Sequence, residues 1–229
     1  MLPVLCDADR TAVDVGANYG MYSFRLVGLA RHSIAFEPIP AFAKMLRSGF
    51  GSRLTVHAVA LSDTHGGEVE LRLPRLFTGY ATIEQNNSLD TRDQESIDLV
   101  RVPRATLDSF DLQNVGFVKI DVEGHEEAVL LGARETLKRC NPCVLIEVEE
   151  RHNAGSVERV LSVVRDLDYA AYVIFDGKLH ALPEFDLVEN QTTESPEVYA
   201  RNIICVPQDR ADALGKKMVA ALNASAPAR

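Results

Sequence analysis

Apolar and polar positions along the chain follow two alternating periods. From residue 11 onward, short runs of β-branched and other apolar residues alternate with segments whose apolar residues recur at helical spacing. This alternation is typical of parallel strands joined by crossover helices. It predicts a doubly wound, Rossmann-like α/β sheet of seven strands, at residues 11–15, 33–37, 54–61, 116–121, 143–149, 169–175 and 201–206.

Amphipathic helices are expected between these strands. One apolar stripe occupies residues 22–30, a second residues 129–137, and a third residues 157–164, preceded by Ser156 as a capping residue. A last surface helix is expected at residues 209–222, followed by a flexible tail at 223–229.

The alternation of strand and helix patterns is interrupted between residues 66 and 103. Strict alternation at residues 69–73 and again at 98–102 predicts an antiparallel pair of strands. The polar stretch between them, residues 74–97, is too long for a tight turn and is either a functional loop or a disordered one. We therefore expect a single domain over residues 1–229, with residues 66–103 as an insertion.

Composition and charge narrow the class of protein. The 229 residues carry 24 Lys and Arg against 33 Asp and Glu, a formal net charge of −9. Because clustered cations are absent from the sequence, nucleic acid is not expected as a partner. No apolar stretch reaches the ~20 residues of a membrane span, and Asp7, Asp9 and Arg10 fall where a signal peptide is apolar. These features predict a cytoplasmic protein.

The cysteines agree with a reduced compartment. Four cysteines in a chain of this length do not indicate a disulfide framework. Cys140 and Cys143 have the spacing of a redox or zinc pair, but they stand where a helix runs into a strand and no second pair is nearby. We interpret them as packing residues.

The first predicted strand runs directly into a small-residue turn. Asp14, Gly16 and Gly20 belong to this turn, and Glu37 ends the next strand. Glycines there let backbone N–H groups approach a ligand, and a carboxylate at the second strand accepts both hydroxyls of a ribose. Tight packing between helix and strand is the alternative explanation for the glycines.

The spacing of the turn favours one cofactor. Pyrophosphate binding uses Gly-x-Gly-x-x-Gly, whereas here Gly16 and Gly20 are separated by three residues and preceded by Asp14. An acidic residue at this strand end repels a pyrophosphate but attracts the ammonium group of a methionine. The turn therefore points to S-adenosylmethionine.

A second group of titratable residues follows the fourth predicted strand. Asp121, Glu123 and His125 come directly after an apolar run, at the sheet edge where open α/β proteins place their sites. Glu126 and Glu127 are better explained as complements to the N-terminal dipole of the next helix. His125 is a candidate general base, but equally a capping or solvated histidine.

The fifth predicted strand carries a carboxylate inside an apolar run. Glu147 is either paired with a cation such as Lys119 on the neighbouring strand or faces the site, and both alternatives stay open. Asp121, Glu123 and Glu147 offer oxygen ligands for Mg²⁺, but no ligand spacing requires a metal, and none is predicted.

These motifs together give the chain a resemblance to a known family. Between residues 11 and 150 it resembles the FkbM-type methyltransferases, which have the class I S-adenosylmethionine-dependent fold. The resemblance rests on Val-Asp-Val-Gly-Ala-Asn-Tyr-Gly at residues 13–20, Phe-Glu-Pro at 36–38, Ala-Leu-Ser-Asp at 60–63, Thr-Leu-Asp at 106–108, and above all Val-Lys-Ile-Asp-Val-Glu-Gly-His-Glu at 118–126.

The resemblance implies a mixed sheet whose last strand is antiparallel, and O-methylation of hydroxyls on sugars or secondary metabolites. It also implies roles for particular residues. Glu37 would hold the ribose, Pro38 and Ala60 would lie beside the adenine, and residues 121–123 would face the donor. The methionine end would be held by Asp14, Gly16, Ala17, Asn18, Tyr19 and Gly20.

The expected reaction is attack of an acceptor hydroxyl on the sulfonium methyl group, with S-adenosylhomocysteine as product. The candidate general bases are Asp121, Glu123 and His125. The expected acceptor is a small molecule or glycan bearing a hydroxyl, and the oligomeric state is left open. Two other functions remain: a nicotinamide-dependent oxidoreductase, and a non-catalytic module that binds an adenosyl ligand.

The polar stretch 74–97 is expected to act as a lid on the acceptor side. Tyr80, Asn86 and Asn87 are suited to stacking on and hydrogen-bonding a polar acceptor. Deletion of the stretch is therefore expected to spare cofactor binding.

Overall fold

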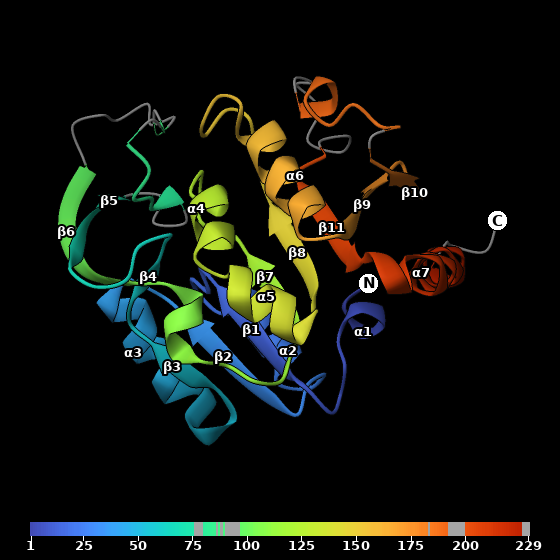
Figure 1. The fold of residues 1–229 in the computed structure, drawn as a ribbon. Coiled ribbons are helices and arrows are strands. Elements are labelled where there is room, and N and C mark those ends of the chain that lie inside the picture. Colours follow the sequence, from blue (N-terminus) through green and yellow to red (C-terminus); the bar gives the residue numbers. More distant parts are fainter. Residues whose placement is uncertain are drawn as a thin grey trace.

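The computed structural model describes residues 1–75, 80–85, 87, 89, 97–182, 184–191 and 200–225. Figure 1 shows a large twisted sheet with helices packed against it, and a smaller sheet of β4, β5 and β6 beside it. This arrangement confirms the doubly wound α/β fold expected from the alternating pattern.

Within the described residues, the large sheet has eight strands in the order β10-β9-β11-β8-β7-β1-β2-β3. The five strands from β8 to β3 pair in parallel, and β9 runs in the same direction, whereas β11 runs antiparallel to both β8 and β9. The last strand is thus antiparallel, as the resemblance implied. The strands are β1 (Thr11–Val15), β2 (His32–Phe36), β3 (Thr55–His57), β7 (Val115–Ile120), β8 (Cys143–Glu147), β9 (Tyr169–Phe175), β10 (Lys178–Ala181) and β11 (Asn202–Pro207).

The expected count of seven strands is one too low, because β10 pairs antiparallel with β9. The two strands are joined by Asp176 and Gly177, which have positive φ angles of 46° and 68°. Asp-Gly is the pair that a tight type I′ turn requires. The signal for this hairpin was therefore in the sequence.

Residues 54–61 were expected to form one strand, and they form two. β3 lies at the edge of the large sheet, whereas β4 (Ala60–Leu61) pairs in parallel with β6 in the small sheet. Residues on both sides of the break are apolar, so the sequence pattern does not show that the strand is interrupted. The break carries Val59 and Ala60 to the wall of the pocket described below.

The insertion contains the predicted antiparallel pair. β5 (Glu68–Pro74) and β6 (Ile97–Ala105) pair continuously from Glu68 opposite Pro103 to Pro74 opposite Ile97. Together with β4 they form the small sheet, whose buried residues pack on Ile39. The insertion is thus joined to the main fold by apolar packing.

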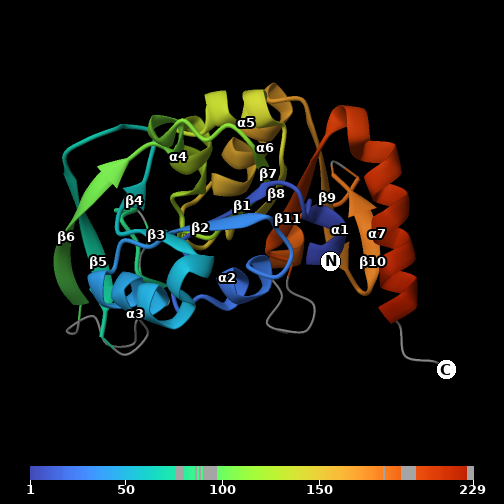
Figure 2. The ribbon, with the colours of Figure 1, turned by 90° about the horizontal axis from the view of Figure 1, so that it is seen from below.

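Helices cover both faces of the large sheet (Figure 2). Alternate strand residues such as Ala12, Phe117 and Leu145 pack with α1, α2 and α7, while Val118 and Ile146 belong to the core under α4, α5 and α6. The helices are α1 (Leu2–Leu5), α2 (Met21–Leu26), α3 (Pro40–Phe50), α4 (Glu126–Leu131), α5 (Arg134–Cys140), α6 (Ser156–Asp166) and α7 (Ala211–Ser225). None of the helices in the described ranges combines the length and the apolar character that a membrane span requires.

Several helix predictions need correction. The helix expected over residues 22–30 ends at Leu26, and α3 was not predicted. The helix expected over residues 129–137 is divided between α4 and α5 at Gly132, where a Cβ atom would lie 2.0 Å from the carbonyl oxygen of Ser62. Residues 223–225 continue α7, and the rest of the expected tail lies outside the described residues.

Ser156 does not cap α6. The N-cap residue is Gly155, and the carboxylate of Glu150 accepts hydrogen bonds from the amides of Gly155 and Val157. The Ser156 hydroxyl instead donates to the carbonyl of Glu149 at 3.3 Å. A carboxylate from the preceding loop has replaced the serine as cap.

The Thr-Leu-Asp motif at residues 106–108 has a structural role. Thr106 caps the short 3₁₀ helix that follows it, since its side chain accepts from the amide of Ser109 at 3.2 Å. Asp108 accepts from the amides of Glu135 and Thr136 at 3.1 and 2.7 Å, and so caps α5 from a distant segment.

We predict that Asp108→Ala lowers the free energy of unfolding by about 1–2 kcal/mol, because two amides at the start of α5 lose their acceptor. Urea denaturation measures the change. Glu135→Ala is the matched control, because it removes an exposed carboxylate from the same helical turn and leaves the cap in place. An equal loss of stability in both variants would contradict the capping role.

Candidate active site

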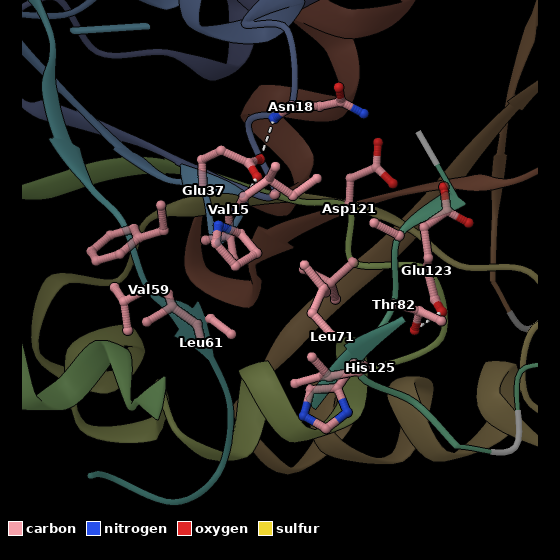
Figure 3. A pocket seen from close by; sticks show the side chains of 18 residues that line it. Val15, Asn18, Glu37, Val59, Leu61, Leu71, Thr82, Asp121, Glu123 and His125 are labelled. Carbon is pink, nitrogen blue, oxygen red and sulfur yellow. Dashed lines mark hydrogen bonds between the residues drawn. The ribbon is translucent and has the colours of Figure 1, made fainter. Parts of the chain in front are cut away.

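A pocket of about 560 Å³, including its open mouth, lies at the carboxyl ends of β1, β2 and β7 (Figure 3). Most of the residues singled out in the sequence line it: Gly16, Asn18, Glu37, Pro38, Ala60, Asp121, Glu123 and His125. Four others lie outside its lining: Asp14, Ala17, Tyr19 and Gly20. The fold therefore brings four separate sequence motifs to one cavity, those at residues 13–20, 36–38, 60–63 and 118–126.

Gly16 is required for close packing of the backbone. Its φ angle is +77°, and a Cβ atom at this position would lie 1.8 Å from the carbonyl oxygen of Asp121. The amides of Gly16 and Ala17 both donate to the carbonyl of Phe36, at 3.0 and 3.2 Å. The expectation that these amides approach a ligand is thus corrected, because they are used within the protein.

The other residues of the turn are held by packing. Gly20 has a φ angle of +85°, and a Cβ atom there would lie 2.6 Å from Cδ2 of Leu46. Tyr19 is 58% exposed and its ring packs on Phe42 with centroids 4.4 Å apart. The alternative explanation of tight helix packing therefore holds for Gly20.

Two polar residues near the turn differ in their surroundings. Asp14 is buried, and its carboxylate accepts from the Ser23 hydroxyl at 2.6 Å. Burial raises the pKa of Asp14 to about 6. Asn18 lines the pocket, and its buried Oδ1 accepts no hydrogen bond from the described residues. Asn18 thus offers an unsatisfied acceptor to a ligand.

Glu37 is fixed at the end of β2. Glu37 is 3% exposed. Its two carboxylate oxygens accept hydrogen bonds from the backbone amides of Asn18 at 2.6 Å and Ile39 at 2.7 Å. Burial raises the pKa of Glu37 to about 7. The carboxylate is therefore held rigidly at the pocket wall, and each oxygen keeps a second lone pair for a ligand.

The open question about Glu147 is answered by its ion pairs. Its carboxylate lies 3.9 Å from Nζ of the buried Lys119 and 3.2 Å from Nε of Arg201 on the neighbouring chain segment. Lys119 also lies 3.5 Å from the carboxylate of Asp121. Lys119 thus connects a pocket residue, Asp121, with Glu147.

Glu123 has an unusual backbone and an unusual acid group. Its φ angle is 53°, and its carbonyl accepts from the side chains of Thr82 and Asn87, both at 2.8 Å. Its carboxylate lies 3.2 Å from Nε2 of His152. Burial, followed by the neighbouring Asp121, raises the pKa of Glu123 to about 8. His152 was not singled out in the sequence, where it follows the acidic cluster at the end of β8.

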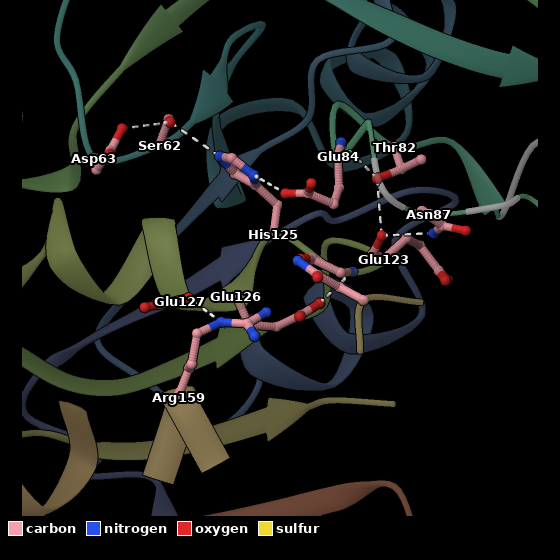
Figure 4. A network of polar contacts seen from close by, with 12 residues as sticks. Ser62, Asp63, Thr82, Glu84, Asn87, Glu123, His125, Glu126, Glu127 and Arg159 are labelled. Atoms are coloured by element: carbon pink, nitrogen blue, oxygen red, sulfur yellow. Dashed lines mark hydrogen bonds and ion pairs between the residues drawn. The ribbon is translucent and has the colours of Figure 1, made fainter. Parts of the chain in front are cut away.

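His125 is the N-cap residue of α4, but its side chain makes no capping hydrogen bond and is largely buried. Its Nε2 lies 2.9 Å from the Ser62 hydroxyl and its Nδ1 lies 3.4 Å from the carboxylate of Glu84 (Figure 4). Burial lowers the pKa of His125. The ring therefore joins β4 to the insertion, with a partner at each nitrogen.

The two glutamates after His125 complete the start of α4, as expected. Glu126 accepts from the amide of Gly124 at 2.9 Å, and Glu127 pairs with Nε of Arg159 on α6 at 2.7 Å. Figure 4 shows these contacts beside those of His125. Glu126 and Glu127 therefore belong to the scaffold.

The insertion also contributes to the pocket. Ala81, Thr82 and Ile83 line it together with Leu71 of β5. Tyr80 lies against Arg151, whose guanidinium carbon is 5.9 Å from the ring centroid, and Asn86 lies outside the described residues. The described residues 81–83 thus line the same cavity as Glu37 and Asp121, and the role of the stretch 74–97 as an acceptor-side lid stays a prediction.

No group of three or more His, Cys, Asp and Glu side chains in the described ranges is arranged to hold a metal ion. All four cysteines are free thiols, and Cys140 and Cys143 are buried. The side chains that line the pocket are carboxylates, an amide, a hydroxyl, an imidazole and apolar groups.

Solved structures share this architecture. Methyltransferase FkbM from Methylobacillus flagellatus KT matches with a TM-score of 0.54 and 17% identity, over 86% of this chain and 44% of its own. A Streptococcus mutans protein described as a methyltransferase, in complex with S-adenosylhomocysteine, matches with a TM-score of 0.50 and 11% identity, over 89% of this chain and 92% of its own. The chain spans less than half the length of the M. flagellatus protein. At these identities the likeness establishes the fold, that of a class I methyltransferase.

The family follows from the sequence. Residues 14–171 match the model of the methyltransferase FkbM domain. The chain therefore belongs to the FkbM methyltransferase family, as the motifs suggested. None of the curated proteins gives a significant match.

The buried acids of the pocket predict how stability depends on pH. A carboxyl whose pKa is raised in the folded state keeps a proton that the unfolded chain has already released, so stability falls as pH rises toward the folded pKa. Glu123, with a pKa of about 8, and Glu37, with a pKa of about 7, act in this sense. His57, His125 and His152 have lowered pKa values and are neutral in both states above pH ~7.

We predict that the free energy of unfolding falls by about 1–2 kcal/mol more in the wild type than in Glu123→Gln between pH ~7 and ~8.5. Glutamine has nearly the same size and shape as the protonated glutamic acid, and its side chain does not titrate. Urea denaturation at the two pH values measures the difference. Parallel pH dependence in the two proteins would show that Glu123 is not a proton-holding acid in the fold.

Proposed function

We propose that this protein transfers the methyl group of S-adenosylmethionine to a hydroxyl of a small molecule or glycan. Membership of the FkbM methyltransferase family supports methyl transfer. The observation that carries the proposal is that Glu37 and Asp121 open onto one cavity, from neighbouring parts of the same sheet edge. This cavity fits a ligand with a ribose at one side and a reacting centre at the other.

The lining residues fit the cofactor. Glu37 is rigidly held where it can accept ribose hydroxyls, and Asn18 presents a buried oxygen that lacks a donor among the described residues. Pro38, Ala60 and Ile83 form an apolar wall suited to an adenine ring. Bound S-adenosylmethionine supplies an electrophilic methyl group.

The residues of the chain contribute positioning and a proton acceptor. Holding the acceptor oxygen in line with the methyl group and the sulfur accounts for much of the expected rate. Asp121 is the favoured general base, because it lines the pocket at the end of β7 and its carboxylate is held 3.5 Å from Nζ of Lys119. It would accept the hydroxyl proton on a carboxylate oxygen.

The other two candidates are less suited to the role near neutral pH. Glu123 holds a proton there because burial raises its pKa to about 8. Both ring nitrogens of His125 already face partners, Ser62 and Glu84. They remain alternatives to Asp121 as the base.

The acceptor class and the cellular location are predicted from the charge and composition of the chain. A formal net charge of −9 supports a small acceptor over nucleic acid, and both this expectation and the cytoplasmic location stay predictions. A module that binds the cofactor without catalysis is the alternative to an enzyme. Production of S-adenosylhomocysteine in a screen of sugar and metabolite hydroxyls distinguishes them.

We predict that S-adenosylhomocysteine stabilises the protein by about 2.7 kcal/mol at a hundredfold excess over its dissociation constant, whereas NAD at the same concentration has no effect. Thermal unfolding with each ligand measures this. Stabilisation by NAD alone would contradict the proposal and favour an oxidoreductase.

We predict that Asp121→Asn lowers turnover by about 10²–10⁴-fold and leaves the affinity for S-adenosylhomocysteine within a few-fold of wild type. The amide keeps the size of the side chain but cannot accept the proton. Methyl transfer to an acceptor found in the screen, together with calorimetric binding, measures both quantities. Loss of cofactor binding with this variant would make Asp121 a binding residue and shift the base to Glu123 or His125.

A further inference from the structure

Lys119 is a cation with no contact to solvent. The residue is 0% exposed, and its Nζ donates to the carbonyl of Ile120 at 2.9 Å. The ring of Tyr22 covers it, with the ring centroid 5.0 Å from Nζ. A buried ammonium is costly unless anions compensate it. The residues around it must therefore supply negative charge.

Three carboxylates supply this charge. Asp121 and Glu147 lie 3.5 and 3.9 Å from Nζ, and Asp14 stands opposite Lys119 in the register of β1 and β7. Arg201 adds a second cation through its 3.2 Å contact with Glu147. When all five groups are ionised, the three carboxylates and the two cations, Lys119 and Arg201, have a net charge of −1.

The charged cluster of Asp14, Lys119, Asp121, Glu147 and Arg201 reaches the pocket through Asp121. Lys119 and Glu147 continue the alternation of Phe117 and Leu145, which pack under α1 and α2, so their side chains lie on that face of the sheet. Asp121 follows at the end of β7 and lines the pocket. Asp121 thus connects the buried charges to the cavity, and the net charge of the cluster acts on any charged group bound there.

We propose that Lys119 is a positioning residue that sets the charge of the donor site, and so the preference of the site between the cationic sulfonium donor and the neutral thioether product. This inference rests on the proposed function. Without Lys119, the three carboxylates would attract the sulfonium more strongly in the ground state. Because the positive charge disappears as the methyl group leaves, such attraction would favour bound donor over the transition state.

The test is the ratio of two dissociation constants, that of S-adenosylmethionine divided by that of S-adenosylhomocysteine, measured by calorimetry at pH ~8.5. The two ligands differ at the sulfur by one methyl group and one charge, so a general loosening of the fold affects both. We expect Lys119→Met to lower the ratio about tenfold, because it removes a positive charge, and Glu147→Gln to raise it about tenfold. Lys119→Arg keeps the positive charge, so its ratio stays at the wild-type value.

Arg165→Gln is the matched control, because it removes a cation from a surface ion pair with Glu158 on α6. Its ratio stays at the wild-type value. An unchanged ratio in Lys119→Met, or shifts of the same sign in Lys119→Met and Glu147→Gln, overturns the inference. If Lys119→Met does not fold, as judged by circular dichroism, an unchanged ratio in Glu147→Gln overturns it alone.

Failure of the proposed function gives a different result. If the wild type binds neither ligand, the donor site itself is wrong and this inference falls with it. If both ligands bind and the ratios do not move in opposite directions, only the role of Lys119 fails.

Discussion

The contact between Gly16 and the Asp121 carbonyl determines how the pocket is built. The backbone oxygen of Asp121 occupies the space in which a side chain at residue 16 would begin, so the end of β1 meets the end of β7 without a gap. The amides of Gly16 and Ala17 meanwhile bind the Phe36 carbonyl and draw the end of β2 to the same place. Three strand ends are thereby joined, and Glu37 and Asp121 face one cavity.

A second set of contacts ties the insertion to this edge. The Glu123 carbonyl accepts from Thr82 and Asn87, and His125 lies between Ser62 and Glu84. These contacts support the left-handed backbone of Glu123, which is otherwise strained for a residue with a side chain. The insertion is therefore both a wall of the cavity and a support for an acidic residue within it.

Local patterns predicted the sheet and five residues of the pocket, whereas Asn18, Pro38 and Ala60 were implied by the family resemblance. The five are Gly16, Glu37, Asp121, Glu123 and His125. Alternation and period identified the strands that carry Asp14, Glu37 and Asp121, and the Asp176–Gly177 hairpin was also readable from turn chemistry. What local patterns do not contain is contact between distant segments. The amides that hold Glu37, the partners of His125 and the closeness of His152 to Glu123 depend on where loops meet in the folded chain.

The same limit explains why the two alternatives for the glycine turn could not be separated from the sequence. Glycines were read as openings for a ligand, whereas Gly16 accommodates a carbonyl and Gly20 accommodates Leu46. Nor does the pattern of the insertion show that Ile83 lies in the wall of the same pocket as Pro38. Pattern alone cannot distinguish space for a ligand from space for the protein itself.

A crystal structure of the complex with S-adenosylhomocysteine tests the central claim most directly. The account predicts ribose hydroxyls within hydrogen-bonding distance of the Glu37 carboxylate, adenine against Pro38, Ala60 and Ile83, and the sulfur on the side of Asp121. A ligand bound in another cavity, or in this one with its ribose away from Glu37, would contradict it.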